Sequence, residues 1–422
     1  MSSEKTNSNL TPPGPIAYLM PEFPGQTHVW FWREVSHMRD WGVDTRLFST
    51  RPPGDETAAR HAFAEQARRE TTYLLPRPIS SIAAAIAWGL RRPRRFARAA
   101  MIPFELDGLS LRERVTTFSL LVPACILARE TASQGIRHIH LHSAARSAVI
   151  ALMANRLSGL RYSFTLHGNL DWWGGGMGAK LENAEFSVAV ADWLLSDIRE
   201  SYPQLDPSAV AVASMGVDTQ TWVPVDGRSG DSGFHLMTVG RLALGKGHDV
   251  TLRALARLHN EGRDARLSII GSGPDRPVLE SLVEELELEG SVVFLGTLSE
   301  EDVIARLRDA DAFVLASRVE PRAVAYMEAM ALGLPTIGTE VGGSAEIITT
   351  EQDGLLVPSD DDERLAAAIA RLMDDSELRR RLSENARRTA VERFDSRIGA
   401  ATLYERLFGT RPPSGEAGLA SS

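Results

Sequence analysis

Short apolar runs alternate with helical patterns along most of this 422-residue chain. Strands that alternate with helices predict parallel sheets covered by helices on both faces. The chain is too long for one ordinary core, so we expect two or three domains. The expected strands are 16–20, 45–48, 73–75, 139–142, 162–166, 186–190, 210–213, 236–239, 267–270, 292–295, 313–315, 336–337 and 355–357.

A stretch rich in Pro, Gly, Asp and Ser at 223–234 separates two series of strands and predicts a linker. The expected fold class is therefore α/β, with two Rossmann-like, doubly wound parallel-sheet domains facing across a cleft. Ligands bind in such clefts, at the carboxyl ends of the strands. The predicted parts are disordered tails at 1–14 and 409–422, domains at 15–222 and 235–390, and at 391–408 a C-terminal helix packing back on the first domain.

Composition and charge exclude several classes of protein. The single cysteine, Cys125, rules out an internal disulfide framework and suits a reducing, cytoplasmic setting. The polar start lacks the apolar core of a signal peptide, and the longest quasi-apolar stretch, 79–90, is too short to span a bilayer. A net charge of −9 argues against nucleic-acid binding.

Two glutamates eight residues apart, Glu320 and Glu328, follow the apolar run 312–317. Pro321 disfavours helix at Glu320 and suits the first helical position itself. We therefore expect Glu320 on the loop after a strand and Glu328 two turns into a helix. Such a strand, loop and helix would place both carboxylates at the carboxyl edge of the sheet. Carboxylates only accept hydrogen bonds, so they suit a ligand rich in hydroxyls, such as a sugar and a ribose. The alternative is two solvated glutamates on a helix face.

Two cations, Arg241 and Lys246, lie in a glycine-rich loop between the strand 236–239 and the next helical pattern. Cations at the N-terminus of a helix form an anion-binding site, and this pair suits a diphosphate. Lys246 is the only lysine after residue 220, in a half of the chain that is otherwise acidic. The alternative is a pair of surface cations in ordinary salt bridges.

Three weaker motifs follow other strands of the same half. Gly271 belongs to the turn Gly-Ser-Gly-Pro, which either admits a ligand or packs strand against helix. The run 292–298 is a strand and turn suited to holding a base. Gly342 and Gly343, with Glu346 after them, form another turn, for which helix capping is the alternative.

In their order and spacing these motifs resemble those of retaining nucleotide-sugar glycosyltransferases of the GT-B fold, group 1 or family 4 type. The resemblance covers roughly 14–408, is strongest over 235–360, and is closest to bacterial exopolysaccharide enzymes of the colanic-acid type. The residues that carry it are Arg241, Lys246, Gly271, the Phe-Leu-Gly run 294–296, Glu320, Glu328 and the Gly-Gly-x-x-Glu run 342–346.

The resemblance implies a role for each matching residue. Arg241 and Lys246 would hold the donor diphosphate, Glu328 the ribose, and Glu320 the transferred sugar. Gly271 and Leu298 would flank the nucleoside. The chain departs from the family over 321–324, where Pro321 replaces a residue with an amide hydrogen. The amides of Arg322, Ala323 and Val324 remain available to an anion at the helix start.

The first half carries two further motifs that match the family. The loop after the first strand contains Gly25, Gln26 and Thr27, which the resemblance places over the donor phosphates and the acceptor site; a plain turn is the alternative. His167 ends a strand, where related enzymes have a histidine near the reacting centre. A buried structural histidine is the rival interpretation.

Two other patterns leave alternatives open. His138, His140 and His142 alternate along one strand and face one side, but no carboxylate or cysteine lies near them in sequence, so we expect no metal. The segment 82–101 is basic and amphipathic, with its arginines at 91–98. It suits either an anionic membrane surface or a solvated helix face.

The sequence thus predicts a cytoplasmic, metal-independent hexosyltransferase-type enzyme without a cofactor. It would move a sugar from a nucleoside diphosphate to a glycan or lipid-linked acceptor in exopolysaccharide biosynthesis, with retention. Catalysis would rest on Glu320, His167, Arg241 and Lys246. The rivals are a GT-B sugar-nucleotide epimerase or hydrolase and a non-catalytic bilobed sugar-nucleotide-binding protein.

Overall fold

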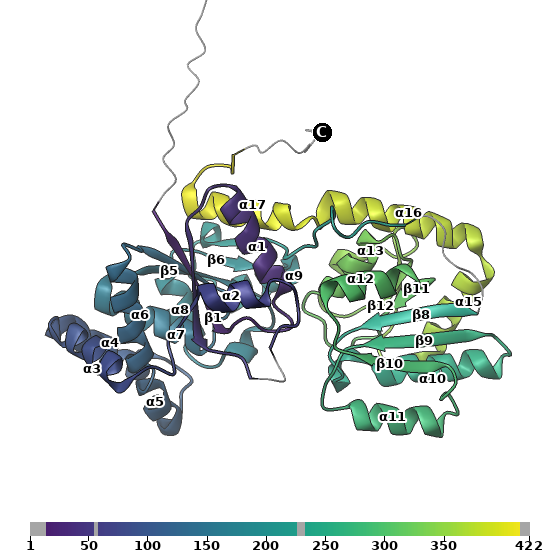
Figure 1. Ribbon diagram of the computed structural model, residues 1–422, viewed down its shortest axis with the longest axis horizontal. Coiled ribbons are helices and arrows are strands. Elements are labelled where there is room, and N and C mark those ends of the chain that lie inside the picture. Colours follow the sequence, from purple (N-terminus) through teal and green to yellow (C-terminus); the bar gives the residue numbers. More distant parts are fainter. Residues whose placement is uncertain (1–13, 55–57, 226–232, 414–422) are drawn as a thin grey trace, which may run out of the picture.

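The computed structural model of this chain describes residues 14–54, 58–225 and 233–413, and it contains two α/β domains (Figure 1). The N-terminal domain is coloured purple to teal in Figure 1, and the C-terminal domain green. Most of the expected linker and of the two expected tails lies outside the described residues.

The N-terminal domain is built on a seven-stranded sheet in the order β3-β2-β1-β4-β5-β6-β7, with every neighbouring pair parallel. Its strands are β1 (Ile16–Glu22), β2 (Thr45–Arg51), β3 (Thr71–Tyr73), β4 (His138–Leu141), β5 (Arg161–Leu166), β6 (Ser187–Ala189) and β7 (Val210–Val212). Its helices are α1 (Val29–Asp40), α2 (Ala64–Glu70), α3 (Ile79–Leu90), α4 (Pro93–Glu105), α5 (Leu111–Phe118), α6 (Leu121–Ser133), α7 (Arg146–Ser158), η1 (Leu170–Trp173), α8 (Met177–Asn183), α9 (Asp192–Ser201) and η2 (Pro207–Ala209).

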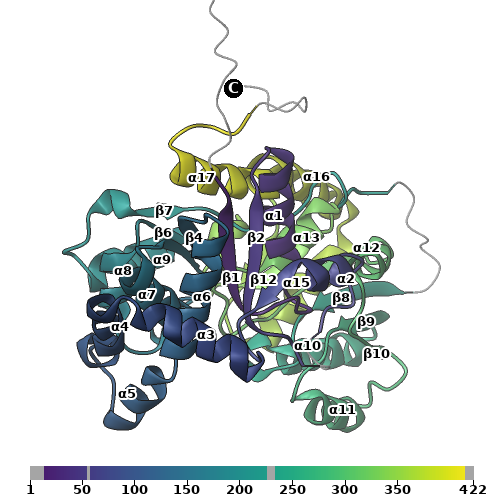
Figure 2. The same ribbon diagram turned by 60° about the vertical axis from the view of Figure 1, so that its left-hand side comes forward.

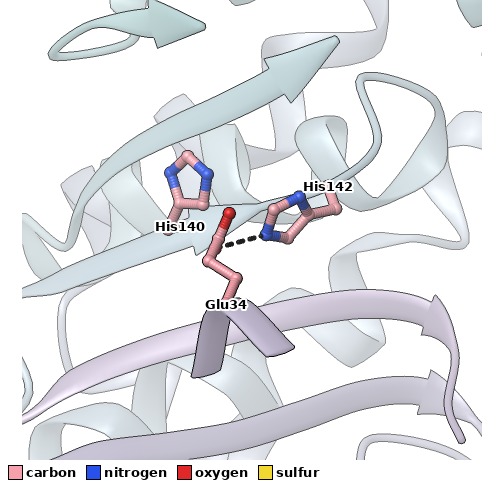
Figure 3. A group of neighbouring side chains, drawn as sticks. All are labelled: Glu34, His140 and His142. Carbon is pink, nitrogen blue, oxygen red and sulfur yellow. Dashed lines mark hydrogen bonds and ion pairs between the residues drawn. The ribbon is translucent and has the colours of Figure 1, made fainter. Parts of the chain in front are cut away.

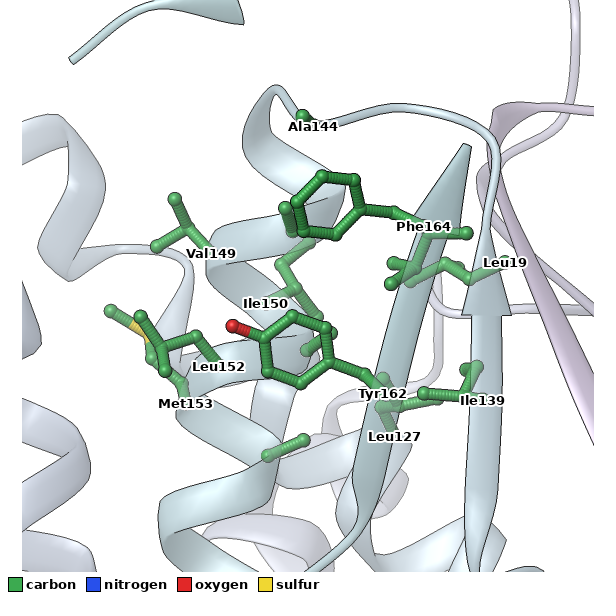
Figure 4. Close-up of a cluster of buried hydrophobic side chains, with 14 of the residues drawn as sticks. Leu19, Leu127, Ile139, Ala144, Val149, Ile150, Leu152, Met153, Tyr162 and Phe164 are labelled. Atoms are coloured by element: carbon green, nitrogen blue, oxygen red, sulfur yellow. The ribbon is translucent and has the colours of Figure 1, made fainter. Parts of the chain in front are cut away.

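The main core of this domain lies between the sheet and the small-residue faces of α6 and α7 (Figure 4). Ile139, Tyr162 and Phe164 reach it from the strands, while Leu127 and Ile150 reach it from the helices. Because helices cover both faces of a parallel sheet, the strands are apolar on both sides. This double burial is why short, nearly continuous apolar runs predicted them.

The C-terminal domain is built on a six-stranded parallel sheet in the order β10-β9-β8-β11-β12-β13. Its strands are β8 (Phe234–Val239), β9 (Ala265–Ile270), β10 (Val292–Gly296), β11 (Ala312–Val314), β12 (Thr336–Thr339) and β13 (Leu355–Val357). Its helical segments are η3 (Leu244–Lys246), α10 (His248–Asn260), α11 (Arg276–Glu285), α12 (Glu300–Arg308), α13 (Val324–Ala331), α14 (Ser344–Ile347), α15 (Asp362–Asp374) and α16 (Ser376–Arg393), followed by α17 (Ser396–Phe408).

The chain crosses between the domains at two adjacent places. The backbone N–H of Val217 donates to the carbonyl of Phe394 at 2.8 Å, and that of Ser396 donates to Val217 at 2.9 Å. On either side of this contact, α16 packs against α13 in the C-terminal domain and α17 packs against α1 in the N-terminal domain. Figure 1 shows both helices in yellow along one side of the molecule, and Figure 2 shows α17 beside α1.

Two local expectations were wrong. Helix α13 begins at Val324 rather than at Pro321, so Glu328 lies little more than one turn into it. The backbone just before the helix is hydrogen-bonded to the other domain instead, because the carbonyl of Pro321 accepts a hydrogen bond from Trp193 Nε1 at 3.0 Å.

The basic segment 82–101 spans two helices, since α3 ends at Leu90 and α4 starts at Pro93.

The second correction concerns the longest apolar stretch. The stretch 111–133 is longer than 79–90, and of the described chain it is the one segment whose length and composition would allow it to cross a membrane. Within it, α6 packs between α3 and α7, which is the behaviour of a core helix.

Candidate active site

Hydrogen bonds between the domains show that the carboxyl ends of the two sheets face each other. Gln26, which follows β1, donates through Nε2 to the carbonyl of Leu298, which follows β10, at 2.9 Å. Glu346, which follows β12, accepts from the backbone N–H groups of Asp192 and Trp193 at 2.9 and 2.7 Å. The cleft edge is where α/β proteins bind their ligands.

Lys246 and Glu320 meet at this edge as an ion pair. The Nζ atom of Lys246, at the end of η3, lies 2.6 Å from Oε2 of Glu320, whose side chain is only 3% exposed. The hydroxyl of Ser317 donates to the same carboxylate at 3.2 Å. The sole lysine of the domain is therefore held against the buried carboxylate of Glu320, which lies on the loop between β11 and α13.

The turn formed by Gly342 and Gly343 packs against the loop that carries Glu320. The N–H of Gly343 donates to the carbonyl of Glu320 at 2.9 Å. Gly342 has a φ of +50°, and a Cβ atom there would stand 2.3 Å from that carbonyl oxygen. Only glycine combines this backbone conformation with so close an approach. The Gly-Gly-x-x-Glu motif thus positions the loop that carries Glu320.

Arg241 lies on the loop after β8 and its side chain is exposed. Its carbonyl is within 3.2 Å of Nε2 of the buried His248, which anchors the loop to α10. Among the described residues the Arg241 guanidinium forms no ion pair. The two predicted diphosphate ligands therefore differ, because Lys246 is already paired and Arg241 is free to meet an anion.

Glu328 is held by a side chain from the opposite domain. Arg33 of α1, only 8% exposed, lies 3.2 Å through Nη2 from Oε1 of Glu328, and the same nitrogen pairs with Glu300 of α12. Trp222 Nε1 donates to Glu300 at 2.9 Å. Burial raises the pKa of Glu328 to about 7, against the opposing effect of the Arg33 charge. This carboxyl is therefore poised between its charged and neutral forms near neutral pH.

The turns after β9 and β10 lie side by side. The hydroxyl of Thr297 donates to Ser272 Oγ at 3.0 Å, and the N–H of Gly271 donates to the carbonyl of Gly296 at 2.8 Å. A Cβ atom on Gly271 would stand 1.9 Å from the carbonyl oxygen of Gly240, so packing alone requires glycine there. Leu298, half-buried, closes this group of turns.

Arg322 turns its side chain toward the domain contact. Its Nη1 atom lies 2.9 Å from Oε2 of Glu346, and its guanidinium lies over the ring of Phe394. Burial lowers the pKa of Arg322. Ala323 is the buried N-cap residue of α13 and Val324 its first residue, so the amides after Pro321 stand at a helix start.

The loop after β1 is fixed at both ends. The N–H of Gly25 donates to His28 Nδ1 at 3.0 Å, and the side chain of Gln26 spans from the N–H of Arg60 to Leu298. Thr27 is exposed. The structure thus brings Gln26 against the turn after β10 and leaves Thr27 on the surface.

The alternating histidines at 138, 140 and 142, in β4 and directly after it, share one face and are hydrogen-bonded to protein groups. Both nitrogens of His140 lie near hydroxyls, Ser163 Oγ at 2.8 Å and Thr165 Oγ1 at 3.0 Å. His142 Nε2 lies 3.0 Å from Oε1 of Glu34, the carboxylate that the sequence did not place near them (Figure 3). Glu34, His140 and His142 converge closely enough to hold a metal ion, but each ring nitrogen already has a protein partner.

His167 stands directly after β5, next to this group. Its Nε2 atom lies 3.2 Å from Nδ1 of His142, and the ring of Trp30 lies over it with centroids 4.4 Å apart. Its Nδ1 atom is buried and has no hydrogen-bond partner among the described residues. Burial, with the neighbouring His142, holds the pKa of His167 well below its usual range.

Four residues of this region were not predicted from the sequence: Arg33, Glu34, Glu300 and Trp193. A local signal existed for the first two, because Arg33 and Glu34 follow the aromatic run Trp-Phe-Trp at 30–32. A charged pair beside so many aromatic residues at a helix start indicates burial with a specific partner. Glu300 and Trp193 carried no comparable signal, since only the packing of the two domains gives them partners.

The comparisons with known proteins agree with this geometry. Residues 226–389 match the family model described as glycosyl transferases group 1. The site residues from Arg241 to Glu346 all lie within this matched stretch, which is less than half of the chain.

Curated relatives match part of the chain. The α-D-kanosaminyltransferase of Streptomyces kanamyceticus is 35% identical over 151 residues, which are 36% of this chain and 39% of that protein. The putative colanic acid biosynthesis glycosyltransferase WcaL of Salmonella typhimurium is 34% identical over 170 residues, 39% of this chain and 42% of its own length. The matches thus cover less than half of either relative.

Solved structures match nearly the whole chain. The Anabaena protein Alr3699/HepE, solved in complex with UDP, has a TM-score of 0.71 and 15% identity, and the match covers 94% of this chain and 100% of that one. This similarity establishes the fold. The two facing parallel-sheet domains are the GT-B architecture, so the expected fold is confirmed.

Proposed function

We propose that this protein is a retaining glycosyltransferase that moves a sugar from a nucleoside diphosphate to a glycan or lipid-linked acceptor, without a metal ion. The observation that carries the proposal is the convergence at one cleft of Lys246, paired with the buried Glu320, and Glu328, held by Arg33. The names of the curated relatives support a glycosyl transfer, and the Anabaena neighbour was solved with UDP and with UDP-glucose.

The chemistry follows from the charges at the cleft. When the bond from sugar to phosphate breaks, negative charge grows on the diphosphate and positive charge on the sugar ring. Arg241 and Lys246, with the amides at the start of α13, would stabilise the diphosphate by preorganised electrostatics. The buried carboxylate of Glu320 would contact the sugar, and Glu328 would accept hydrogen bonds from the ribose hydroxyls. A phosphate oxygen of the leaving diphosphate would take the proton of the acceptor hydroxyl. The acceptor oxygen would then bond to the anomeric carbon on the face that the diphosphate leaves, which would give retention.

The decisive experiment compares Arg241→Ala and Lys246→Ala with Arg306→Ala, an exposed arginine of α12 outside the cleft loops. Either cleft substitution should lower turnover by about 10²-fold or more, with unchanged circular dichroism, and Arg306→Ala should stay near wild type. Donor sugars would be found by a thermal-shift screen of UDP-, GDP- and ADP-sugars, because bound ligand raises the apparent stability. Near-normal turnover in both cleft variants would refute the diphosphate assignment.

The same assay separates the rival functions. An epimerase or hydrolase would convert the nucleotide sugar with no acceptor present, whereas a transferase requires one. A non-catalytic binding protein would show the thermal shift and no turnover with any acceptor tried. For the transferase we propose a cytoplasmic location and a role in exopolysaccharide synthesis.

We further propose that the outer end of the N-terminal domain rests on an anionic membrane, which would bring the enzyme to a lipid-linked acceptor. Helices α3, α4 and α5 form this end, far from the C-terminal domain (Figure 1). They expose apolar side chains, among them Ile79 at 85%, Phe104 at 57% and Leu111 at 76%. Five arginines at 91, 92, 94, 95 and 98 are exposed beside them. Exposed apolar and cationic groups together suit the surface of an anionic bilayer.

A further inference from the structure

A cavity of about 270 Å³ lies where the chain crosses between the two domains, and we term it the crossover cavity. Asp192, the first residue of α9, and Ser214, just after β7, line it from the N-terminal domain. Arg322, before α13, and Arg393, at the end of α16, line it from the C-terminal side. Because a water molecule takes about 30 Å³, the cavity has the volume of about nine waters and room for a small organic ligand. Neither of the two cations proposed for the donor diphosphate lines it.

Two arginines in the wall of the crossover cavity lie over one aromatic ring. The guanidinium carbon of Arg322 is 5.5 Å from the ring centroid of Phe394, and that of Arg393 is 5.1 Å from it. Like charges on one ring repel each other unless an anion offsets them. Burial lowers the pKa of Arg322, and the nearby charge of Arg393 acts in the same direction. An anion bound between the two guanidinium groups would relieve this repulsion.

The carboxylate of Glu346 offsets the charge of Arg322 but not that of Arg393. It accepts hydrogen bonds from the backbone N–H groups of Asp192 and Trp193 at 2.9 and 2.7 Å, and from Nη1 of Arg322 at 2.9 Å. Arg393 donates only to the backbone carbonyl of Glu346, at 3.0 Å, and it pairs with no carboxylate among the described residues. Its charge is therefore available to a ligand.

A ligand can reach these groups from solvent. Asp192 and Arg393 are both exposed where they line the cavity. The side chain of Arg322 is 8% exposed, and its Nη2 atom, unlike its buried Nε atom, is not shielded from solvent and has no hydrogen-bond partner in the described chain. The carboxylate of Asp192 forms no ion pair with the described residues, and it can only accept hydrogen bonds. The cavity thus offers donors to an oxyanion and an acceptor to a hydroxyl.

We infer that the crossover cavity binds a small hydroxylated molecule that carries one oxyanion, of the class of sugar phosphates and sugar carboxylates. The two guanidinium groups hold the oxyanion, because their planar forks match the geometry of phosphate and carboxylate. Asp192 accepts a hydrogen bond from a hydroxyl of the same molecule. Arg322 belongs to the run 321–324, where this chain departs from the family pattern, and the site accounts for a charged side chain there. The inference does not rest on the proposed function, since it concerns binding without glycosyl transfer.

The test is isothermal titration calorimetry of the full chain with glucose 6-phosphate and with glucuronate, compared with glucose and with inorganic phosphate. At least one of the two sugar anions should bind, and the one that binds more tightly distinguishes a phosphate site from a carboxylate site. Glucose should not bind, because it has no charge for the arginines. Inorganic phosphate should bind more weakly, since it brings no sugar hydroxyl to Asp192. Absence of binding by both sugar anions would overturn the inference, and tighter binding of inorganic phosphate would overturn the role of Asp192.

Two matched substitutions in α16 locate the bound anion. Arg393→Met keeps an apolar stem over Phe394 but removes the charge, so it should weaken binding about tenfold or more, as expected for the loss of a charge-assisted hydrogen bond. Arg388→Met removes an exposed arginine of the same helix that does not line the cavity, and it should bind like wild type. Circular dichroism checks that both variants are folded. Equal affinity in Arg393→Met and wild type would refute the site.

Two substitutions in the cleft separate the crossover cavity from the proposed donor site. Arg241→Ala and Lys246→Ala should keep the affinity for the sugar anion, because neither residue lines the cavity. Binding lost in these variants and kept in Arg393→Met would place the anion at the donor site and overturn the inference. Failure of the proposed function is distinguishable, since these titrations contain no nucleotide sugar and measure no turnover.

Discussion

Glu328 should lower the stability of this protein at neutral pH. Burial raises the pKa of its carboxyl from an ordinary value of 4.5 to about 7 in the folded chain, with Arg33 opposing the rise. The side chain is only 16% exposed. We predict that Glu328→Gln, which keeps the shape and an oxygen for Arg33 but removes the titrating group, stabilises the protein at pH 8 and lowers its turnover.

The magnitude follows from proton linkage. Because the folded state holds its proton more tightly than the unfolded state, the free energy of unfolding falls as pH rises from 4.5 to about 7. The penalty is absent below pH 4.5 and fully present above pH 7. Each pKa unit corresponds to about 1.4 kcal/mol, so ionised Glu328 costs about 3 kcal/mol at pH 8. At pH 5 the cost should be less than about 1 kcal/mol.

The assay is urea unfolding of wild type and Glu328→Gln at pH 5 and pH 8, followed by circular dichroism. The variant should be more stable by about 3 kcal/mol at pH 8, and the two proteins should nearly coincide at pH 5. Glu301→Gln, an exposed carboxylate of α12, is the control and should change stability by less than about 0.5 kcal/mol. A variant that is less stable than wild type at pH 8 would refute the reasoning, because Glu328 would then be a net stabilising partner of Arg33.

Three further predictions follow from other contacts. Arg33→Met leaves Glu300 and Glu328 without their cation, and should cost about 3 kcal/mol at pH 8 by urea unfolding and less at pH 5, whereas an equal loss at both pH values would argue for lost packing instead. Gly342→Ala forces a Cβ atom against the Glu320 carbonyl in a left-handed conformation, so it should cost more than about 1 kcal/mol and lower turnover, while Gly290→Ala, with open space around it, should not. Replacing Arg91, Arg92, Arg94 and Arg95 by Ser should abolish sedimentation with anionic vesicles, as should Phe104→Ser with Leu111→Ser; sedimentation equal to wild type in both variants would exclude the proposed membrane contact.

The sequence predicted much of the fold because the relevant signals are local. A strand buried on both faces is a short apolar run, and the helices between such runs repeat every 3.6 residues. All the expected strands have a counterpart in the structure, although β3 starts at Thr71 rather than Tyr73. The start of α13 was misplaced at Pro321 because the contact of that carbonyl with Trp193 comes from the other domain.

The candidate site was also predictable only in part, because some of its residues follow from local sequence and others from domain packing. Lys246, Glu320 and the glycine turns could be placed at this edge from the sequence because each lies on a loop after a strand, and Glu328 because it lies in the helix that follows one; chain direction brings these segments to the same edge of the sheet. Their partners were not found. Arg33 meets Glu328 across 295 residues of sequence, and the nearest carboxylate to His142 is 108 residues away, on α1.

The sequence by itself thus determined two parallel-sheet domains, the family resemblance and the residues at the strand ends, because periodicity and loop position are written in consecutive residues. Only the tertiary structure decided which charges are paired. It placed Lys246 on Glu320 and Arg33 on Glu328, and it set His167 beside His142 and Glu34. The physical reason is that pairing, burial and hydrogen position depend on distances between groups from different elements, and packing the two domains together sets those distances.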